Sequence, residues 1–133
     1  MRTCFDEGMK ENAKADALES RLIKFAGDIM TLVSQLPKTP QGKHIASQIL
    51  RSGTAAAPNY AEARGAESRA DFIHKLRIAL KELNETSIWL RVIQRGFEIS
   101  PDTLSALVAE NTELCRILVA SVQTAKRKMT IDE

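Results

Sequence analysis

The sequence predicts an all-α protein folded as an antiparallel up-down-up-down four-helix bundle. Of its 133 residues, 44% are hydrophobic and 27% charged, while only 5% are aromatic. This composition, with few Gly and Pro residues, favours a soluble helical domain over a sheet. Four segments repeat apolar residues at spacings of three and four, as amphipathic helices do. The short connections between these segments predict that neighbouring helices run antiparallel.

The first predicted helix has a single apolar face and ends at two prolines. Pro37 and Pro40 end it, because proline disfavours helical geometry in the residue before it. Thr39 is suited to cap the second helix, with Pro40 at its first position. The apolar face consists of Leu22, Phe25, Ala26, Ile29, Val33 and Leu36.

The second predicted helix contains a stretch of low side-chain bulk, from Arg51 to Gly65. Small side chains let another helix approach closely, so we expect close helix packing along this stretch. Gly65 is suited to end the helix. The inner face consists of Ile45, Ile49, Ser52, Ala56, Asn59, Tyr60 and Ala63.

The third and fourth helices begin at recognisable capping residues. Ser68 precedes Asp71 by three positions, an N-terminal capping pattern, and Gly96 is suited to end the third helix. Ser100 and Pro101 open the fourth helix. The inner face of the third helix is Phe72, Leu76, Ala79, Leu83, Thr86 and Leu90, and that of the fourth is Leu104, Leu107, Val108, Asn111, Leu114, Cys115, Leu118 and Val122. We expect a bundle over residues 15–128, between a polar N-terminal segment (1–14) and a C-terminal tail (129–133).

The charge distribution makes the middle of the chain basic. Residues 37–95 contain ten Lys/Arg and five Asp/Glu, whereas the segments before and after carry a small net negative charge. Cys4 and Cys115 are too few and too far apart for a disulfide framework. The N-terminus lacks a signal-peptide core, and no apolar run approaches the roughly 20 residues that span a bilayer. We therefore expect a cytoplasmic protein without a membrane partner.

The third helix has more apolar surface than a bundle core needs. A projection at about 100° per residue places four of its apolar residues off the core face, and one of them is the single Trp. Soluble monomers seldom expose a contiguous apolar patch of this kind. We interpret the four as an oligomer interface, and the alternative is a wide core in which the Trp covers a helix–helix groove. The residues are Ile78, Trp89, Val92 and Ile93.

The same projection aligns four cationic side chains of the third helix into one stripe. We interpret the stripe as a surface that binds nucleic-acid phosphates, helped by cations elsewhere in the chain. The alternative is an ordinary solvated helix face. The stripe consists of Arg77, Lys81, Arg91 and Arg95, and the helping cations are Arg64, Arg69, Lys126, Arg127 and Lys128.

Charged residues also flank the low-bulk stretch of the second helix. Because half-buried charges need partners, we predict a structural polar network that joins Arg51, Asn59 and Glu62 to Glu82 and Glu85. The alternative is a set of separate surface charges.

Motifs for metal or catalytic chemistry are missing from the sequence. Glu82 and Glu85 invite comparison with di-iron bundles, but those require Glu-x-x-His motifs, and neither His44 nor His74 follows a glutamate by three. No phosphate-binding loop, zinc spacing or nucleophile motif is present. We expect no metal, no cofactor and no catalytic residues, and therefore a protein that is not an enzyme.

Several short motifs together resemble those of a bacterial four-helix-bundle family. They are RSGT (51–54), NYAEA (59–63), SRADFIHKL (68–76), ELNET (82–86) and WL (89–90). On these residues the chain resembles proteins encoded within intervening sequences of 23S ribosomal RNA genes. The likeness extends from about Ile29 to Gln94, and it departs at Ala55, where relatives often carry serine.

The resemblance implies a homo-oligomer, with a ring of five bundles as the expected assembly, and no assigned enzymatic activity. A related group similar in fold, the accessory variability proteins of diversity-generating retroelements, binds nucleic acid and a reverse transcriptase. Our leading hypothesis is therefore a non-enzymatic oligomer that binds structured RNA or DNA. The alternative is an oligomeric scaffold that binds another protein, such as a reverse transcriptase, without nucleic acid.

Overall fold

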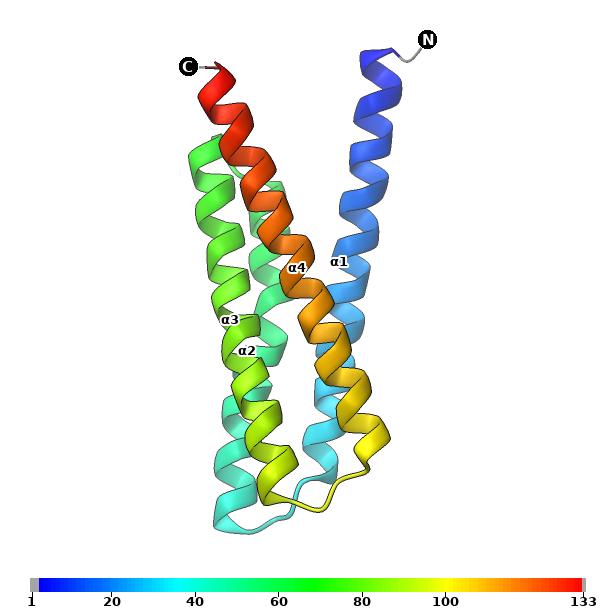
Figure 1. Cartoon of the computed structure of the whole chain (residues 1–133), viewed down its shortest axis with the longest axis vertical. Coiled ribbons are helices and arrows are strands. Elements are labelled where there is room, and N and C mark those ends of the chain that lie inside the picture. The colour runs from blue at the N-terminus through cyan, green and yellow to red at the C-terminus, as the bar shows by residue number, and fades with distance from the viewer. Residues whose placement is uncertain (1–2, 133) are drawn as a thin grey trace.

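The computed structural model describes residues 3–132 and contains four α-helices. They are α1 (Cys4–Gln35), α2 (Pro40–Arg64), α3 (Arg69–Gly96) and α4 (Pro101–Asp132), and the described part of the chain contains no strand. The prediction of an all-α, four-helix protein is confirmed. Both ends of the chain lie at one end of the molecule, and the α1–α2 and α3–α4 connections lie at the other (Figure 1).

Local capping explains why the helices begin and end where they do. The side chains of Thr39 and Ser68 accept hydrogen bonds from the backbone N–H groups of Gly42 and Asp71, each at 3.1 Å. These contacts satisfy donors that the first helical turn leaves without partners. Gly65 caps the C-terminus of α2, as predicted.

Two helices are longer than the sequence analysis predicted. The segment expected to be a polar N-terminal extension is helical from Cys4, because Thr3 and Asp6 form a capping box in which each side chain accepts from the other's backbone N–H. At the other terminus, α4 continues through the predicted tail to Asp132.

The core consists of buried apolar side chains contributed by all four helices. Burying these side chains is the main stabilising contribution to the fold. The largest fully buried ones are Phe25, Leu22, Ile29, Leu32, Ile49, Leu76, Leu83, Leu90, Ile93, Leu104, Leu114 and Leu118.

The low-bulk stretch of α2 allows close packing on two sides, as predicted. A Cβ atom added to Gly53 would lie 2.9 Å from side-chain carbons of Ile29 on α1, so only glycine fits this approach. On the other side, the buried Thr86 hydroxyl of α3 donates to the Glu82 carbonyl at 2.8 Å and is hydrogen-bonded to the Ser52 hydroxyl at 2.9 Å. Small residues therefore hold α2 against both of its neighbours.

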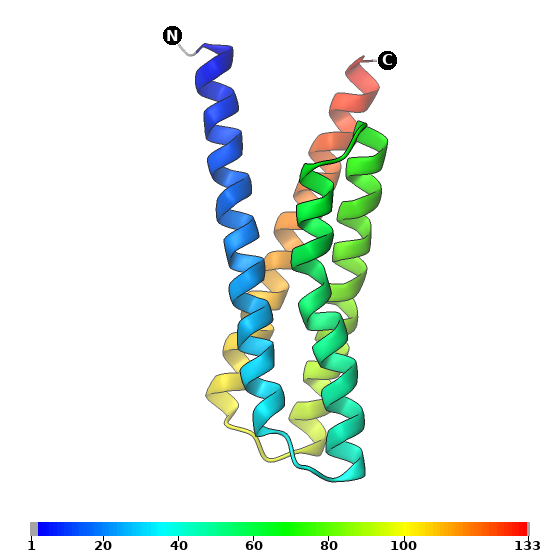
Figure 2. The same ribbon diagram turned by 180° about the vertical axis from the view of Figure 1, so that it is seen from behind.

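The bundle is closed along most of its length and open at the end that carries the termini. There the first turns of α1 stand apart from the last turns of α4 in both views (Figures 1 and 2). Of the neighbouring helix pairs, α1 and α4 make the fewest contacts. One ion pair, between Lys128 and Glu11 at 3.7 Å, spans the opening.

Candidate nucleic-acid interface

The predicted cationic stripe lies on the outer surface of α3. All four of its side chains, Arg77, Lys81, Arg91 and Arg95, are exposed. Among the residues that the structure describes, none of the four forms an ion pair. The stripe is therefore available to an external anion.

One edge of this stripe borders α4. Asn84, which lies between Lys81 and Arg91, has its Oδ1 3.7 Å from the Cys115 Sγ of α4. Burial raises the pKa of the half-buried Cys115 thiol. The stripe thus faces the seam between α3 and α4.

The opposite side of α3, towards α2, pairs its charges. The Arg51 guanidinium contacts Glu82 at 3.3 Å and also contacts Glu85. About two turns before Glu82 on α3, the Lys75 ammonium donates to Glu62 at 3.0 Å. This hydrogen bond raises the pKa of Lys75. The carboxylates along this side are therefore paired with cations of the chain itself.

These contacts correct part of the predicted polar network. Arg51 meets Glu82 and Glu85 as proposed, but Glu62 binds Lys75 instead. The Asn59 amide donates at 2.8 Å to the Ala55 carbonyl of its own helix. An asparagine within a helix can reach the carbonyl one turn earlier in the same helix without any partner from a neighbouring helix. Asn59 makes this local bond and therefore lies outside the network.

Two of the helping cations are neutralised by α1. The Arg64 guanidinium lies 2.9 Å from Asp16 and 3.5 Å from Glu19, and its hydrogen bond to Asp16 raises the pKa of Arg64. Lys128 is the residue that reaches Glu11. Both residues are therefore less suited to phosphate binding than the stripe.

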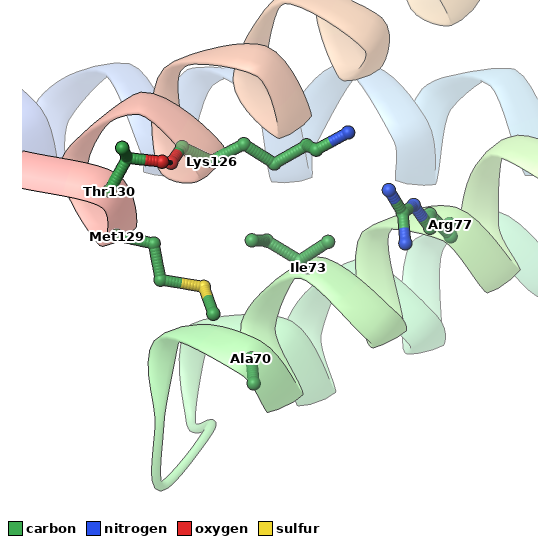
Figure 3. Close-up of a pocket in the computed structure, with 6 residues that line it drawn as sticks. All are labelled: Ala70, Ile73, Arg77, Lys126, Met129 and Thr130. Atoms are coloured by element: carbon green, nitrogen blue, oxygen red, sulfur yellow. Dashed lines mark hydrogen bonds between the residues drawn. The ribbon is translucent and has the colours of Figure 1, made fainter. Parts of the chain in front are cut away.

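The remaining helping cations lie near the open end. Arg69 is the first residue of α3, and the Arg127 guanidinium is 3.4 Å from the Thr124 hydroxyl of its own helix. Lys126 lies opposite Arg77 across a cavity of about 290 Å³ (Figure 3). The cavity joins the basic surfaces of α3 and α4, and its lining is Ala70, Ile73, Arg77, Lys126, Met129 and Thr130.

The predicted oligomer interface is only partly on the surface. Ile93 is fully buried in the core, which corrects its assignment to the interface. An ideal helix drifts by about 20° per heptad relative to the 3.5-residue repeat of packed helices. Three heptads separate Phe72 from Ile93, so the projection rotated Ile93 by about 60° away from the core face that it occupies.

The other three interface residues differ in exposure. Trp89 and Ile78 are half-buried, and only Val92 is exposed. The Trp89 ring packs edge-on to the His44 ring of α2, with centroids 6.5 Å apart, and its buried Nε1 has no partner among the described residues. Trp89 therefore covers the groove between α2 and α3.

Exposed apolar side chains occur at positions that the sequence analysis missed. Ile88 lies in the cationic stripe of α3 and is 53% exposed, next to the exposed Val92. Ile23 and Met30 on α1 and Leu50 on α2 are exposed as well. Ile23 and Met30 each come one position after a core residue of α1, Leu22 and Ile29. One position turns a side chain by about 100° around the helix, so the sequence could have indicated that both side chains point away from the core.

Two further observations concern other kinds of site. In the part of the chain that the structure describes, no three His, Cys, Asp or Glu residues are grouped closely enough to hold a metal ion. None of the described helices combines the length and apolar character needed to cross a membrane.

Comparison with known proteins identifies the family. The family model described as "23S rRNA-intervening sequence protein" matches residues 14–120. A crystal structure of a protein of unknown function from the S23 ribosomal protein family of Bacteroides thetaiotaomicron VPI-5482 is similar to this chain. It has 36% sequence identity and a TM-score of 0.76 over 83% of this chain and 98% of that one. No curated protein is similar enough in sequence to count as a match. The chain belongs to the 23S rRNA-intervening sequence protein family.

Proposed function

We propose that this protein is a non-enzymatic, oligomeric, antiparallel four-helix bundle that binds RNA or DNA through the outer face of α3. The observation that supports this most strongly is the contrast in pairing on α3. Its carboxylates at positions 82 and 85 are bound by Arg51, while the four stripe cations have no ion-pair partner among the described residues. An unpaired row of cations is the electrostatic footprint of a polyanion-binding surface.

The dimensions of the stripe suit a nucleic-acid backbone. Arg77 and Arg95 are 18 residues apart, which corresponds to about 27 Å along a helix. A rod of that length lies against several consecutive phosphates. Binding of this kind releases counterions and weakens steeply as salt rises.

Recognition is expected to depend on phosphates rather than on base stacking. Phe25 and Tyr60 are buried, and Phe72, Trp89 and Phe97 are half-buried. The aromatic side chains whose exposure the structure describes therefore form no exposed platform of the kind that single-strand binders use.

Self-association would multiply a weak affinity for each bundle. Exposed apolar side chains outside the cationic stripe lie on different helices, Val92 on α3, Ile23 and Met30 on α1, and Leu50 on α2. Contact between unlike surfaces of successive copies generates a ring when the rotation closes. A ring of five would present five stripes to one ligand, and the linked contacts would raise the avidity.

The test is a salt series with purified protein. We expect binding of a structured RNA and of duplex DNA at low salt, and a linear fall of log affinity with log salt. Exchanging all four stripe cations for Gln should lower low-salt affinity by about 100-fold or more, because several phosphate contacts disappear.

A variant with the same loss of charge provides the control. Lys10, Lys14, Lys38 and Lys43 are exposed and form no ion pair with other described residues, so their exchange for Gln removes four charges away from the stripe. Equal losses for the two variants would contradict the assignment of the stripe. Absence of any binding at low salt would contradict the function, and capture of a protein partner after nuclease treatment would then favour the scaffold alternative. Measurement of the solution mass tests the oligomer separately.

A further inference from the structure

We infer that the cavity between Arg77 and Lys126 is a subsite for one unpaired nucleotide, whose phosphate lies between the two cations and whose sugar and base lie over an apolar floor. This inference rests on the proposed function and deepens it, because a duplex alone would not use the cavity.

The two cations define an anion position. Figure 3 shows the Arg77 and Lys126 side chains, from α3 and α4, extending towards one another above Ile73. Neither forms an ion pair with another described residue. Two facing cations repel each other, and an anion between them removes the repulsion and gains charge-assisted hydrogen bonds.

The floor of the cavity is apolar rather than polar. Ile73 is 6% exposed and belongs to the core, and Met129 is half-buried against it. The Thr130 hydroxyl in the wall is engaged with the Lys126 carbonyl at 3.1 Å. The site therefore offers little beyond two charges for a polar ligand to bind, but it offers an adaptable thioether surface to a flat apolar body.

These features together select a nucleotide outside a base-paired stack. The volume of about 290 Å³ lies just below the range for ligand pockets, which begins at about 300 Å³, so the site suits no more than a single nucleotide. In a duplex the bases are paired and stacked, so none can enter a surface pocket, whereas an unpaired nucleotide can place its base there. A neighbouring hollow shares Lys126 and Thr130 and adds Arg127, which continues the basic path along α4.

The decisive experiment compares single-stranded and duplex RNA of equal length at low salt. Arg77→Gln and Lys126→Gln should each lower single-strand affinity by about 10-fold, and duplex affinity by only about 3-fold. The matched controls are Arg91→Gln and Lys81→Gln, which remove the same charges from the stripe outside the cavity. They should lower both affinities by the same factor, about 3-fold.

The apolar floor has its own test. Met129→Ala should lower single-strand affinity by about 3-fold without changing the salt dependence, while Val119→Ala, at an exposed apolar position on α4, should have no effect. The methyl resonance of Met129 should shift on addition of the single strand but not of the duplex. Circular dichroism and solution mass of each variant check that it keeps its fold and assembly.

The outcomes separate this inference from the proposed function. If the protein binds strands but cavity and control variants lose the same affinity and the Met129 methyl does not shift, the subsite is wrong and the function stands. If no strand binds, the proposed function is wrong. The subsite is then tested by adding adenosine 5′-monophosphate and following the methyl resonance of Met129. A Met129 shift that requires Arg77 would support the same chemistry with a free nucleotide as its source, and the absence of a shift would overturn the subsite.

Discussion

The two sides of α3 use charged residues in opposite ways. Towards α2, Glu82 and Glu85 bind Arg51, and Lys75 binds Glu62 at 3.0 Å. On the outer side and towards α4, the cations from Arg77 to Arg95 are exposed and form no ion pairs with other described residues. One helix therefore pairs charges inside the chain on one side and leaves them for an external anion on the other.

The difference teaches that the paired side contributes more to charge balance than to stability. Its ion pairs are substantially exposed, with 52% of the Arg51 side chain accessible. Such pairs contribute only about 0–1 kcal/mol each. The seam between α2 and α3 is stabilised mainly by buried side chains such as Leu83 and by the buried Thr86–Ser52 hydrogen bond. Four changes test this separation, given from the largest expected effect to the smallest.

Leu83→Ala should have the largest effect on stability, because it removes a fully buried core side chain of α3. Leu83 is fully buried, so we expect a loss of about 2–5 kcal/mol in the free energy of unfolding. Denaturant titration measures this loss. Ile88→Ala, on the exposed face of the same helix, should change stability by less than about 0.5 kcal/mol. Similar losses at the two positions would show that the outer face is packed in solution.

Glu82→Gln combined with Glu85→Gln should convert the paired side into an extension of the cationic stripe. The change frees Arg51 and raises the net charge by two. We expect RNA affinity at low salt to rise by about 10-fold, while the free energy of unfolding falls by no more than about 1 kcal/mol. Glu67→Gln combined with Glu98→Gln adds the same charge at exposed positions outside the seam and should give a smaller gain. Unchanged affinity in the seam variant would show that Arg51 is too far from the bound strand.

Thr86→Val should weaken the seam without affecting binding. The substitution keeps the shape of the side chain and removes the hydroxyl that is hydrogen-bonded to the Ser52 hydroxyl at 2.9 Å. We expect a loss of about 1 kcal/mol in the free energy of unfolding, because one buried hydrogen bond disappears. Affinity for RNA should remain as in the wild-type protein. A stability equal to that of the wild-type protein would mean that Ser52 finds another acceptor.

The smallest effect is the pH dependence of the pair between Lys75 and Glu62. The hydrogen bond to Glu62 raises the pKa of Lys75 in the folded protein. The stabilisation is therefore present below the ordinary lysine pKa and disappears as pH rises through the raised value. The difference in unfolding free energy between wild type and Lys75→Gln should stay constant up to about pH 10 and shrink at higher pH. A difference that grows with pH would contradict the pairing.

Local signals in the sequence were sufficient for the helices and most of their ends. Thr39, Ser68 and Gly65 cap their helices through contacts with residues close by in the sequence. The order of residue types along the chain is therefore enough to predict these helix ends. The early start of α1 carried the same kind of signal, since Thr3 precedes Asp6 by three positions. The extent of that helix was therefore predictable in principle.

Choices between helices were harder to predict, because they depend on how helices wind around each other. Ile93 was misplaced because a straight-helix projection ignores supercoiling. Glu62 was joined to Glu82 and Glu85 in the predicted network but binds Lys75, because the register of α2 against α3 places Glu62 beside Lys75 and Arg51 beside Glu82 and Glu85. The cavity between Arg77 and Lys126 had no sequence signal, since it depends on where α4 lies at the open end of the bundle.

The ion pair between Lys128 and Glu11 gives the first turns of α1 an unusual dependence on solution conditions. Residues 6–17 are exposed except for the half-buried Gly8 and Ala15, and the ties of this part of α1 to the other helices include Lys128–Glu11 and the Arg64 contacts with Asp16 and Glu19. Salt screens such contacts but strengthens apolar burial. In concentrated salt, backbone amides near Glu11 should therefore exchange with deuterium sooner, while those around Ile29 become better protected.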